Sequence, residues 1–488
     1  MSRVYKTRAP TPGPPPPISI ESQTVTRSPL DVHRPTGARP RPRPPRPFRA
    51  PRILYGAVLL LALAATAACS DPQPPVTGAI LISIDTLRYD HLDCYGYERN
   101  TSPNLDKLCD DAAVFDQAIS QAPSTLPSHA SMLTSLIPQH HGASFAEHGA
   151  LPKEVETLAE LFRAHGFRTA SFNDGGQVAG IWGLGQGFQI YHSNEPGHFQ
   201  TEVDQGLAWL DSLPAGARFF LFLHTYEVHH PYTPSPKDLA RFGGDQYHGW
   251  LGHDVSIPEL VTINEGRRLA LPRDVKFIEE AYDAEIYSMD RALGHLLKAL
   301  GHKHLLDRTA LVFTSDHGEE FGEHGKYGWH GHTLYDELLR VPLVLTLPGH
   351  RWAGERIRRQ VRLIDVAPTL ADAAGLPIPR SWEGVSLLRI LRGEEIEPLL
   401  AVSKLDTDED ENIASIRTGR WKLYDGRLLD LRNDPREQTA NVAWKHPKLV
   451  KELQARLDEL TKGGPQGEAS DVDLDEKTVE RLKALGYF

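Results

Sequence analysis

The sequence predicts an α/β fold in which helices sandwich a large, mostly parallel sheet, followed by a smaller C-terminal antiparallel-sheet α+β subdomain. Apolar runs of strand length alternate with amphipathic, helix-like segments over most of the 488 residues, the order expected of successive βαβ units. Several of these apolar runs end directly before a carboxylate or a histidine. Short alternating segments are found only near the end of the chain, as expected of a separate antiparallel sheet.

The first predicted strand, residues 79–84, is a continuous apolar run that ends at Asp85, which is typical of a buried parallel strand. Further strands are expected at residues 167–172, 219–224, 309–314 and 341–347, and helices at 104–115, after Pro127, and at 155–165, 202–213 and 275–300. Because the carboxyl ends of parallel strands share one edge of a sheet, the polar residues that follow them should meet there.

Short segments after residue 401 alternate like antiparallel strands on either side of an Asp-Gly turn, at 413–417, 421–424 and 427–431. Helices are expected after them, near 448–461 and 476–485. No internal repeat of fixed period is present. The sequence therefore predicts a catalytic domain over residues 78–400, and a C-terminal subdomain with tail helices over residues 401–488.

Residues 1–52 have a composition that cannot form a packed core. They contain fourteen of the 38 prolines and eleven Lys or Arg residues against two acidic ones, so we expect this segment to be disordered. The rest of the chain is then more acidic than the net charge of −11 suggests, which argues against nucleic acid as a partner.

Residues 53–69 are interpreted as a signal peptide or a membrane anchor. The apolar stretch is short for a spanning helix but suits a signal peptide, and it ends in small residues before Cys69, as in a lipoprotein signal. We therefore expect an exported, periplasmic or otherwise extracytoplasmic protein, with a lipid at Cys69, an uncleaved membrane anchor or simple cleavage as the alternatives. In that compartment Cys94 and Cys109 would form one disulfide bridge or stay as two buried free thiols.

A candidate metal site follows from the ends of two predicted strands. Asp316 and His317 come after the strand at 309–314, so they should reach the same sheet edge as Asp85. Two carboxylates and an imidazole together suit a divalent cation. An Asp-His pair by itself more often forms a surface pair or a turn, so the neighbouring residues decide between the two interpretations.

Thr125 is the candidate nucleophile. It precedes Pro127 in a segment that reads as a loop entering a helix, and a helix N-terminus at this place would favour an anion. A hydroxyl there, coordinated by a cation, would lose its proton more readily and could attack phosphorus or sulfur. The alternative is that Thr125 only caps the helix.

Histidines are concentrated in two Gly- and aromatic-rich loops that follow predicted strands: His224, His229, His230, His317, His324, His330 and His332. Residues 319–333 lack hydrophobic periodicity and are dense in titratable groups, which is typical of a functional loop. Such a loop could position and protonate an ester oxygen.

Several motifs, taken in chain order, resemble one known family: Asp85-Thr86-Leu87-Arg88, Ser102-Pro103-Asn104-Leu105, Thr125-Leu126-Pro127-Ser128-His129-Ala130-Ser131, Ser315-Asp316-His317-Gly318-Glu319, Leu334-Tyr335-Asp336-Glu337 and Arg340-Val341-Pro342-Leu343. Together they resemble the sulfatase family of the alkaline-phosphatase-like superfamily, and the resemblance extends to the ending Leu482 to Tyr487. It implies a metal-dependent hydrolase of sulfate esters. The implied ligands of one divalent cation, usually calcium, are Asp85, Asp316, His317 and Thr125.

Thr125 departs from the family pattern, in which a cysteine or serine at this position becomes formylglycine. Threonine is not a substrate for that conversion, so no formylglycine is expected. Thr125 instead resembles the threonine nucleophile of phosphodiesterases and phosphotransferases in the same superfamily, for which Mn²⁺ or Zn²⁺ would replace calcium. Thr86 is a second departure, because many sulfatases have another aspartate there, although this variant resembles a familiar subgroup.

The resemblance also implies catalytic roles for three histidines. His129 stands where the family has an arginine that helps to hold the nucleophile and the ester oxygens. His229 matches the histidine of a His-x-Pro-Tyr motif and would donate a proton to the leaving group. His330 lies beside the position of a family basic residue.

Three functional hypotheses stay open after the sequence is considered. The first is a sulfate-ester hydrolase with Thr125 at the nucleophile position. The second is a phosphodiesterase or phosphotransferase in which Thr125 forms a covalent intermediate. The third is a non-catalytic binding protein with the same fold. All three expect an anionic sulfate or phosphate ester as the partner, on a glycan or a lipid head group, and the first two are enzymes.

Overall fold

The computed structural model describes residues 75–407, 413–439 and 441–487, and within them the main feature is a nine-stranded sheet. Its order is β11-β2-β10-β6-β1-β5-β3-β4, with β9 paired to β2. The strands are β1 (Gly78–Ile84), β2 (Ala113–Ile119), β3 (Arg168–Asn173), β4 (Ile190–Ser193), β5 (Phe219–Thr225), β6 (Thr309–Ser315), β9 (Arg340–Val341), β10 (Leu343–Thr346) and β11 (Arg356–Arg362). Most of the neighbouring strands are parallel, which confirms the predicted fold class.

The register of the central strands brings three strand ends together. β1 pairs in parallel with β5 and β6, so Ile84 lies opposite Thr225 on one side and Ser315 on the other. Every residue of these three strands is buried, as expected of continuous apolar strands that are covered on both faces. Asp85 and Asp316 directly follow the paired residues, so their side chains start from neighbouring points of one sheet edge.

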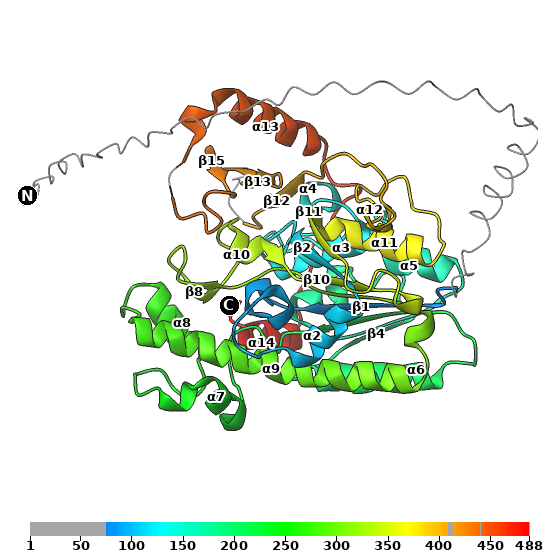
Figure 1. Ribbon diagram of the computed structural model, residues 1–488, viewed down its shortest axis with the longest axis horizontal. Helices are drawn as coiled ribbons and strands as arrows, with labels where there is room; N and C mark the ends of the chain where they lie inside the picture. The colour runs from blue at the N-terminus through cyan, green and yellow to red at the C-terminus, as the bar shows by residue number, and fades with distance from the viewer. Residues whose placement is uncertain (1–74, 408–412, 440, 488) are drawn as a thin grey trace, which may run out of the picture. The chain divides into compact units, whose positions relative to one another are not determined.

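Helices cover both faces of this sheet (Figure 1). Their bounds are α2 (Pro103–Asp110), α3 (Thr125–Thr134), α4 (Pro138–His141), α5 (Leu158–Ala164), α6 (Gln200–Ser212), α7 (Pro236–Phe242), α8 (Ile257–Asn264), α9 (Pro272–His302), α10 (Asp336–Leu339), α11 (Val366–Ala373), α12 (Leu388–Leu391), α13 (Pro447–Leu460) and α14 (Glu476–Ala484). α2, α6 and the long α9 share one hydrophobic core with the sheet. α3, α5 and α11 share a second core on the opposite face.

Two segments differ from the sequence prediction. The helix expected at 104–115 ends at Asp110, and residues 113–119 form β2 instead, because their apolar side chains are buried beside β10 and β11. The strand expected at 341–347 is divided at Pro342, which has no N–H to donate to a neighbouring strand. Its two parts, β9 and β10, run antiparallel to β2.

A second sheet follows residue 400 and is antiparallel throughout, as the sequence predicts. Its strands are β12 (Ala401–Lys404), β13 (Ala414–Arg417), β14 (Trp421–Tyr424) and β15 (Arg427–Asp430), in that order across the sheet. One face packs against α13 through Leu453 and Leu457. The domain boundaries proposed from the sequence stay a prediction.

A buried group of charges joins this second sheet to α10. Lys422, in β14, is fully buried, and its Nζ lies 2.7 Å from Oδ1 of Asp336 and 2.8 Å from Oε1 of Glu437. Arg417, in β13, pairs with the same Asp336 at 2.7 Å. These contacts satisfy charges that would otherwise be costly to bury. They also fix the position of α10 against the second sheet.

α14 carries the last described residues to the main sheet. Asp475 caps the helix by accepting a hydrogen bond from the backbone N–H of Thr478 at 2.7 Å. Leu482 and Leu485 are buried in the core that contains α3 and α5. The turn after α14 is therefore held against the main domain, and it leads to Tyr487.

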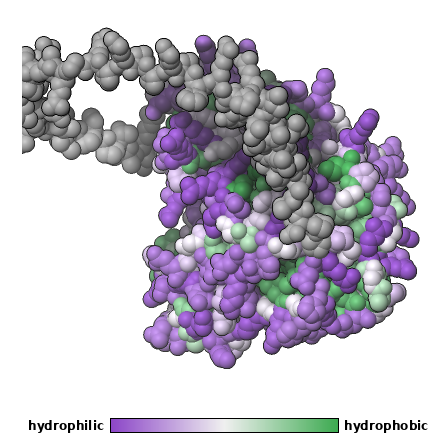
Figure 2. Space-filling view, turned by 45° about the vertical axis from the view of Figure 1, so that its right-hand side comes forward, coloured by the Kyte–Doolittle hydropathy of each residue, from purple (hydrophilic) through white to green (hydrophobic). Residues whose placement is uncertain are grey.

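The predicted disordered segment 1–52 and the predicted signal or anchor 53–69, with Cys69, lie outside the described residues, so export and membrane attachment stay predictions. Among the helices that the structure describes, none is both long enough and apolar enough to span a membrane. The face shown in Figure 2 is largely hydrophilic, with hydrophobic side chains in smaller groups. Cys94 and the buried Cys109 are free thiols.

Candidate active site

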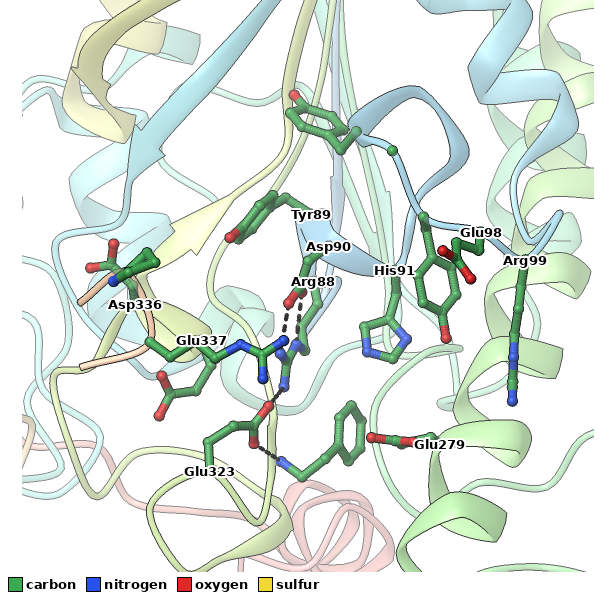
Figure 3. A pocket seen from close by; sticks show the side chains of 16 residues that line it. Arg88, Tyr89, Asp90, His91, Glu98, Arg99, Glu279, Glu323, Asp336 and Glu337 are labelled. Atoms are coloured by element: carbon green, nitrogen blue, oxygen red, sulfur yellow. Dashed lines mark hydrogen bonds and ion pairs between the residues drawn. The ribbon is translucent and has the colours of Figure 1, made fainter. Parts of the chain in front are cut away.

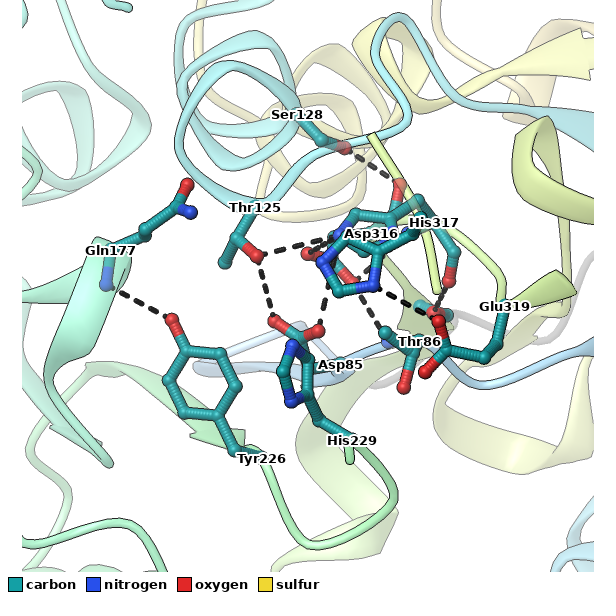
Figure 4. A network of polar contacts seen from close by, with 12 residues as sticks. Asp85, Thr86, Thr125, Ser128, Gln177, Tyr226, His229, Asp316, His317 and Glu319 are labelled. Atoms are coloured by element: carbon teal, nitrogen blue, oxygen red, sulfur yellow. Dashed lines mark hydrogen bonds and ion pairs between the residues drawn. The ribbon is translucent and has the colours of Figure 1, made fainter. Parts of the chain in front are cut away.

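Three side chains at the ends of β1 and β6 form the centre of the site (Figure 4). Asp85 follows β1, and Asp316 and His317 follow β6. Nε2 of His317 lies 3.4 Å from Oδ2 of Asp316 and 3.9 Å from Oδ1 of Asp85. All three residues are fully buried, and their ligand atoms lie within 4.8 Å of one another. The structure thus brings together the predicted metal-binding residues.

Two carboxylate oxygens of this group, Oδ1 of Asp85 and Oδ2 of Asp316, have no hydrogen-bond partner among the described residues. Burial raises the pKa of Asp85 to about 6, although His317 lowers it in part. Burial and the neighbouring Asp85 also raise the pKa of Asp316. Buried oxygens without partners are costly, and a divalent cation would satisfy both of them. The donor set of two carboxylates and one imidazole therefore fits such a cation.

Thr125 is the first residue of α3 and directs its hydroxyl toward this group. Its Oγ1 lies 3.1 Å from Oδ2 of Asp85 and 3.4 Å from Nε2 of His317. The N-cap position is occupied by Ser124, so the alternative in which Thr125 merely caps the helix does not hold. The hydroxyl is therefore available for chemistry at the carboxylate pair.

The surroundings of α3 fix the position of Thr125. All residues of the helix are buried. The backbone N–H of Leu126 donates to Oε1 of Gln177 at 3.1 Å, and Oγ of Ser128 donates to the carbonyl of Asp316 at 2.7 Å. The partial positive charge at the N-terminus of this ten-residue helix favours an anion beside Thr125.

His129 lies one turn after Thr125 but contacts its backbone rather than its hydroxyl. Nδ1 of His129 lies 2.9 Å from the carbonyl oxygen of Thr125, and Nε2 lies 3.0 Å from Oγ of Ser83. Burial lowers the pKa of His129 to about 4, so the ring is neutral and does not supply the charge of an arginine. The structure therefore gives the predicted catalytic His129 the contacts of a positioning residue.

A tyrosine hydroxyl lies between Thr125 and the two histidines His229 and His330. The hydroxyl oxygen of Tyr487 lies 3.3 Å from Oγ1 of Thr125, 3.2 Å from Nε2 of His229 and 3.4 Å from Nε2 of His330. Burial lowers the pKa of His229 well below its usual value and that of His330 to about 4. Both rings are therefore neutral at pH 7.

Tyr487 and His224 belong to the site but were given no catalytic or metal-binding role from the sequence, although His224 was among the histidines noted there. Tyr487 is 362 positions from Thr125 in the chain, and the resemblance of the ending to one family is the one signal that pointed to it. His224 is the next-to-last residue of β5, and its Nε2 lies 3.4 Å from Oδ2 of Asp85. Its place at the end of an apolar run is the signal that could have assigned it a role beside Asp85.

Glu319 orients the histidines that follow β5 and β8 (Tyr327–Trp329). Its Oε1 lies 3.0 Å from Nδ1 of His330, and its Oε2 accepts a hydrogen bond from the hydroxyl of Tyr232 at 3.1 Å. Burial alone would raise the pKa of Glu319. His330 and His230 lower it by a larger amount, so the pKa lies well below its usual value. Glu319 is therefore a buried carboxylate anion.

The segment predicted as a loop at 319–333 contains a short hairpin, formed by β7 (Glu320–Phe321) and β8. His324 and His332 belong to this hairpin region and pair with Glu337 at 2.5 Å and Glu320 at 2.8 Å. Neither of these two histidines has a contact with Thr125. Only part of the histidine-rich sequence therefore contributes to the site.

Two cavities lie near these elements. One of about 780 Å³ is lined by Arg88, Glu323 and Glu337 among others, and Figure 3 shows the ion pairs of Arg88 with Asp90 and Glu323. Thr125 does not line it. A smaller cavity of about 150 Å³ is lined by His230, His330, Gln177 and Tyr487, so it opens on the site.

A comparison with family models identifies the chain. A model described as Sulfatase matches residues 78–376, which is more than half of the sequence. The chain belongs to the sulfatase family. A second model, described as N-sulphoglucosamine sulphohydrolase, C-terminal, matches residues 322–463. Membership of the sulfatase family makes the protein an ester hydrolase, and it confirms the family resemblance that the sequence motifs indicated.

Curated relatives and solved structures agree with this sulfatase assignment. Arylsulfatase K of Homo sapiens is 26% identical over 405 residues, covering 70% of this chain and 74% of the relative. Arylsulfatase A of Homo sapiens is 27% identical over 422 residues, covering 75% of this chain and 77% of the relative. A phosphonate monoester hydrolase of Agrobacterium radiobacter has a TM-score of 0.66 at 21% identity, covering 83% of this chain and 99% of that chain.

A second solved structure, a complex with the substrate D-glucosamine-2-N,6-O-disulfate, has a TM-score of 0.64 at 20% identity. It covers 80% of this chain and 98% of that chain. At these identities, both structural likenesses concern the fold. They agree with the sulfatase-family architecture of a mostly parallel sheet and a separate C-terminal antiparallel sheet.

Removal of divalent cations should lower the melting temperature of this sulfatase-family protein. A cation that binds the native state stabilises it by about 2.7 kcal/mol at a concentration 100-fold above its Kd. Calorimetry of the full chain with and without EDTA measures the shift. The difference in melting temperature with and without EDTA should be smaller in Asp316→Asn, which removes one of the unpaired buried carboxylate charges. Equal melting temperatures in EDTA and in divalent cation would contradict the metal site.

Proposed function

We propose that the protein hydrolyses sulfate esters, with Thr125 as the nucleophile and one divalent cation held by Asp85, Asp316 and His317. The observation that carries this proposal is the position of the Thr125 hydroxyl, 3.1 Å from Asp85 at the N-terminus of a buried helix. A cation bound there would polarise the ester and favour the deprotonated hydroxyl. Calcium is the proposed ion, since family members usually hold it.

The residues around Thr125 support a two-step reaction. The hydroxyl proton passes to Asp85, and Oγ1 forms a bond to sulfur while the bond from sulfur to the alcohol oxygen breaks. The alcohol oxygen takes up a proton from His229. A water molecule then attacks sulfur and gives a proton back to His229, the bond from sulfur to Oγ1 breaks, and Oγ1 recovers its proton from Asp85 as sulfate leaves. No formylglycine is needed at any step.

His229 is the proposed proton donor to the leaving oxygen. Its Nδ1 donates to the carbonyl oxygen of His230, so Nε2 must gain a proton before it can donate one. A bound anionic ester would favour that protonated form, because an opposite charge nearby stabilises the imidazolium. His330 would hold an ester oxygen, and His129 would position the backbone of Thr125.

Phosphoesters are the second candidate substrates, and Thr125 itself is the observation that favours them. An unmodified hydroxyl can form a covalent phosphoenzyme in the same geometry. The fold likeness to a phosphonate monoester hydrolase adds support. Hydrolysis by this route would break a phosphorus–oxygen bond and leave a threonine phosphate for water to cleave.

A panel of chromogenic substrates separates the two candidates. We expect the full chain with Ca²⁺ to release nitrophenol from 4-nitrophenyl sulfate faster than from 4-nitrophenyl phosphate or bis-4-nitrophenyl phosphate. Parallel reactions with Mn²⁺ and Zn²⁺ test the choice of metal ion. Faster release from a phosphoester would show that phosphoesters, and not sulfate esters, are the substrates. Absence of metal-dependent release from all three compounds would support a non-catalytic binding role.

A further inference from the structure

A third cavity lies where the main sheet meets the second sheet. It has a volume of about 420 Å³ and is lined by residues of β2, α10 and β9 on one side, and by residues of β13 and of the segments after β13 and β15 on the other. Four of the nine residues that line it are arginines: Arg340, Arg417, Arg420 and Arg432. We call it the arginine cavity. Neither Thr125 nor any proposed metal ligand lines it, so it is separate from the candidate active site.

The acidic side chain of the arginine cavity is already neutralised. Among the described residues that line the cavity, Asp336 alone carries a carboxylate. Its two oxygens pair with Nη2 of Arg417 at 2.7 Å and with Nζ of Lys422 at 2.7 Å. Lys422 also pairs with Glu437, so the charges of these four side chains balance one another. Asp336 therefore has no charge left to compensate the other three arginines.

Arg420 is held by two neighbours and keeps free donors. Its Nε and Nη2 donate to the two oxygens of Asp430 at 3.0 and 2.8 Å. Its Cζ lies 4.4 Å from the ring centroid of Trp421. No acceptor among the described residues contacts its Nη1. Because a guanidinium has five N–H groups in a fixed plane, Arg420 can bind a further oxygen without losing Asp430.

Arg340 and Arg432 have no carboxylate partner among the residues that the structure describes. Nε of Arg340 donates to the carbonyl of Asp116 at 2.9 Å, and its Nη1 donates to the hydroxyl of Tyr89 at 2.9 Å. These acceptors are uncharged, so they orient the half-buried guanidinium without balancing its charge. Arg432 is exposed, and its guanidinium has no hydrogen bond or ion pair within the described part of the chain. Two positive charges of the cavity therefore stay uncompensated.

From this arrangement we infer that the arginine cavity binds an organic anion through Arg340 and Arg432. Planar guanidinium groups match the oxygens of a sulfate, phosphate or carboxylate group and bind them by charge-assisted hydrogen bonds. The volume of the cavity is that of a small-molecule site and exceeds what an inorganic ion fills, so the anionic group is carried on a larger body. Gly419, Leu431 and Pro435 form an uncharged wall for that body.

The two uncompensated arginines come from different sheets. Arg340 belongs to β9 of the main sheet, and Arg432 follows β15 of the second sheet. An anion bound to both would connect the two sheets and stabilise their packing, in addition to the buried charges around Asp336. Asp336 and Arg340 also belong to two sequence motifs that the reaction at Thr125 does not use. The inference goes beyond the proposed function and holds whichever ester is cleaved.

Calorimetric titration of the full chain tests this inference. The probes are glucose 6-sulfate, glucose 6-phosphate, glucuronate and uncharged glucose, and EDTA keeps divalent cations away from Asp85 and Asp316. We expect an anionic probe to bind with a Kd below about 1 mM and glucose not to bind. Arg340→Gln and Arg432→Gln should each weaken this binding about 10-fold, the effect of losing a hydrogen bond to a charged group. Arg163→Gln, at an exposed position of α5, is the matched control and should keep the full affinity.

Gly419 offers a second test that removes no arginine. A Cβ added at Gly419 would meet no atom within 4 Å, so Gly419→Glu and Gly419→Gln should both fold. The new carboxylate of Gly419→Glu should compete with the anion for the guanidinium groups, whereas the uncharged glutamine of the same size should lower the affinity less. If Arg340→Gln does not fold, Arg432→Gln and Gly419→Glu decide the question, because both positions are exposed.

Three results would overturn the inference. The first is that no anionic probe binds more tightly than glucose. The second is that the arginine variants that fold keep the full affinity, and the third is that Arg163→Gln loses as much affinity as they do. Anion binding by a protein that hydrolyses no ester would refute the proposed function alone, so the two failures are distinguishable.

Discussion

Replacement of Thr125 by alanine should reduce the rate of ester hydrolysis by about 10³-fold or more. Thr125 is the only hydroxyl among the described residues for which a contact with Asp85 is observed, at 3.1 Å from Oδ2. Alanine removes the proposed nucleophile, whereas Thr125→Ser keeps a hydroxyl on the same helix and should retain part of the activity. The measurement is kcat and KM for the best substrate of the panel.

Thr134→Ala is the matched control, because Thr134 ends the same helix. Its hydroxyl donates to the carbonyl of Ala130 at 2.6 Å, away from the carboxylates. The control should keep its activity, and melting curves of all three variants show whether each one folds. Near-normal kcat in a folded Thr125→Ala protein would exclude Thr125 as the nucleophile. Equal losses in the serine and alanine variants would indicate a structural role.

Replacement of Lys422 by methionine should destabilise the protein by about 3–5 kcal/mol. The Lys422 ammonium group is fully buried between Asp336 and Glu437, and methionine would leave these carboxylates with one cation fewer. Burial already raises the pKa of Glu437 to about 7 although Lys422 opposes it. Urea unfolding followed by circular dichroism measures the change in midpoint.

Two further variants show whether the unpaired charge is the cause of this loss. Lys298→Met alters an exposed lysine of α9 and should change the free energy of unfolding by no more than about 0.5 kcal/mol. Adding Glu437→Gln to Lys422→Met removes the carboxylate that lost its partner and should restore part of the stability. An unshifted midpoint in Lys422→Met would mean that the group contributes nothing to the fold.

The central sheet was predictable because its strands are short apolar runs that end in polar residues. Those runs placed Asp85, Asp316 and His317 at one edge, and parallel pairing explains why they meet. The extent of β2 was not predictable, because residues 113–119 follow a helix with no turn signal between them. Their burial against β10 and β11 decides the outcome, and that burial depends on tertiary structure.

The candidate site was predictable for the residues that directly follow a strand. It was less predictable for residues whose role depends on the direction of the side chain. His129 stands in a motif that resembles the family's, but its ring turns toward the backbone of Thr125 and toward Ser83. Helix periodicity alone does not give that rotamer. Tyr487 could not be placed by periodicity at all, because only the packing of α14 brings it near Thr125.

The docking of α14 has a consequence for the order of events during synthesis of the protein. Tyr487 reaches the hydroxyl of Thr125 across 362 positions of sequence. A ribosome therefore releases Thr125 long before it releases the tyrosine that faces it, and the contact forms late because distant segments pair slowly. A nascent chain that already holds the main sheet would still lack this contact. The hydroxyl of Thr125 thus gains its tyrosine neighbour only after translation has passed residue 487.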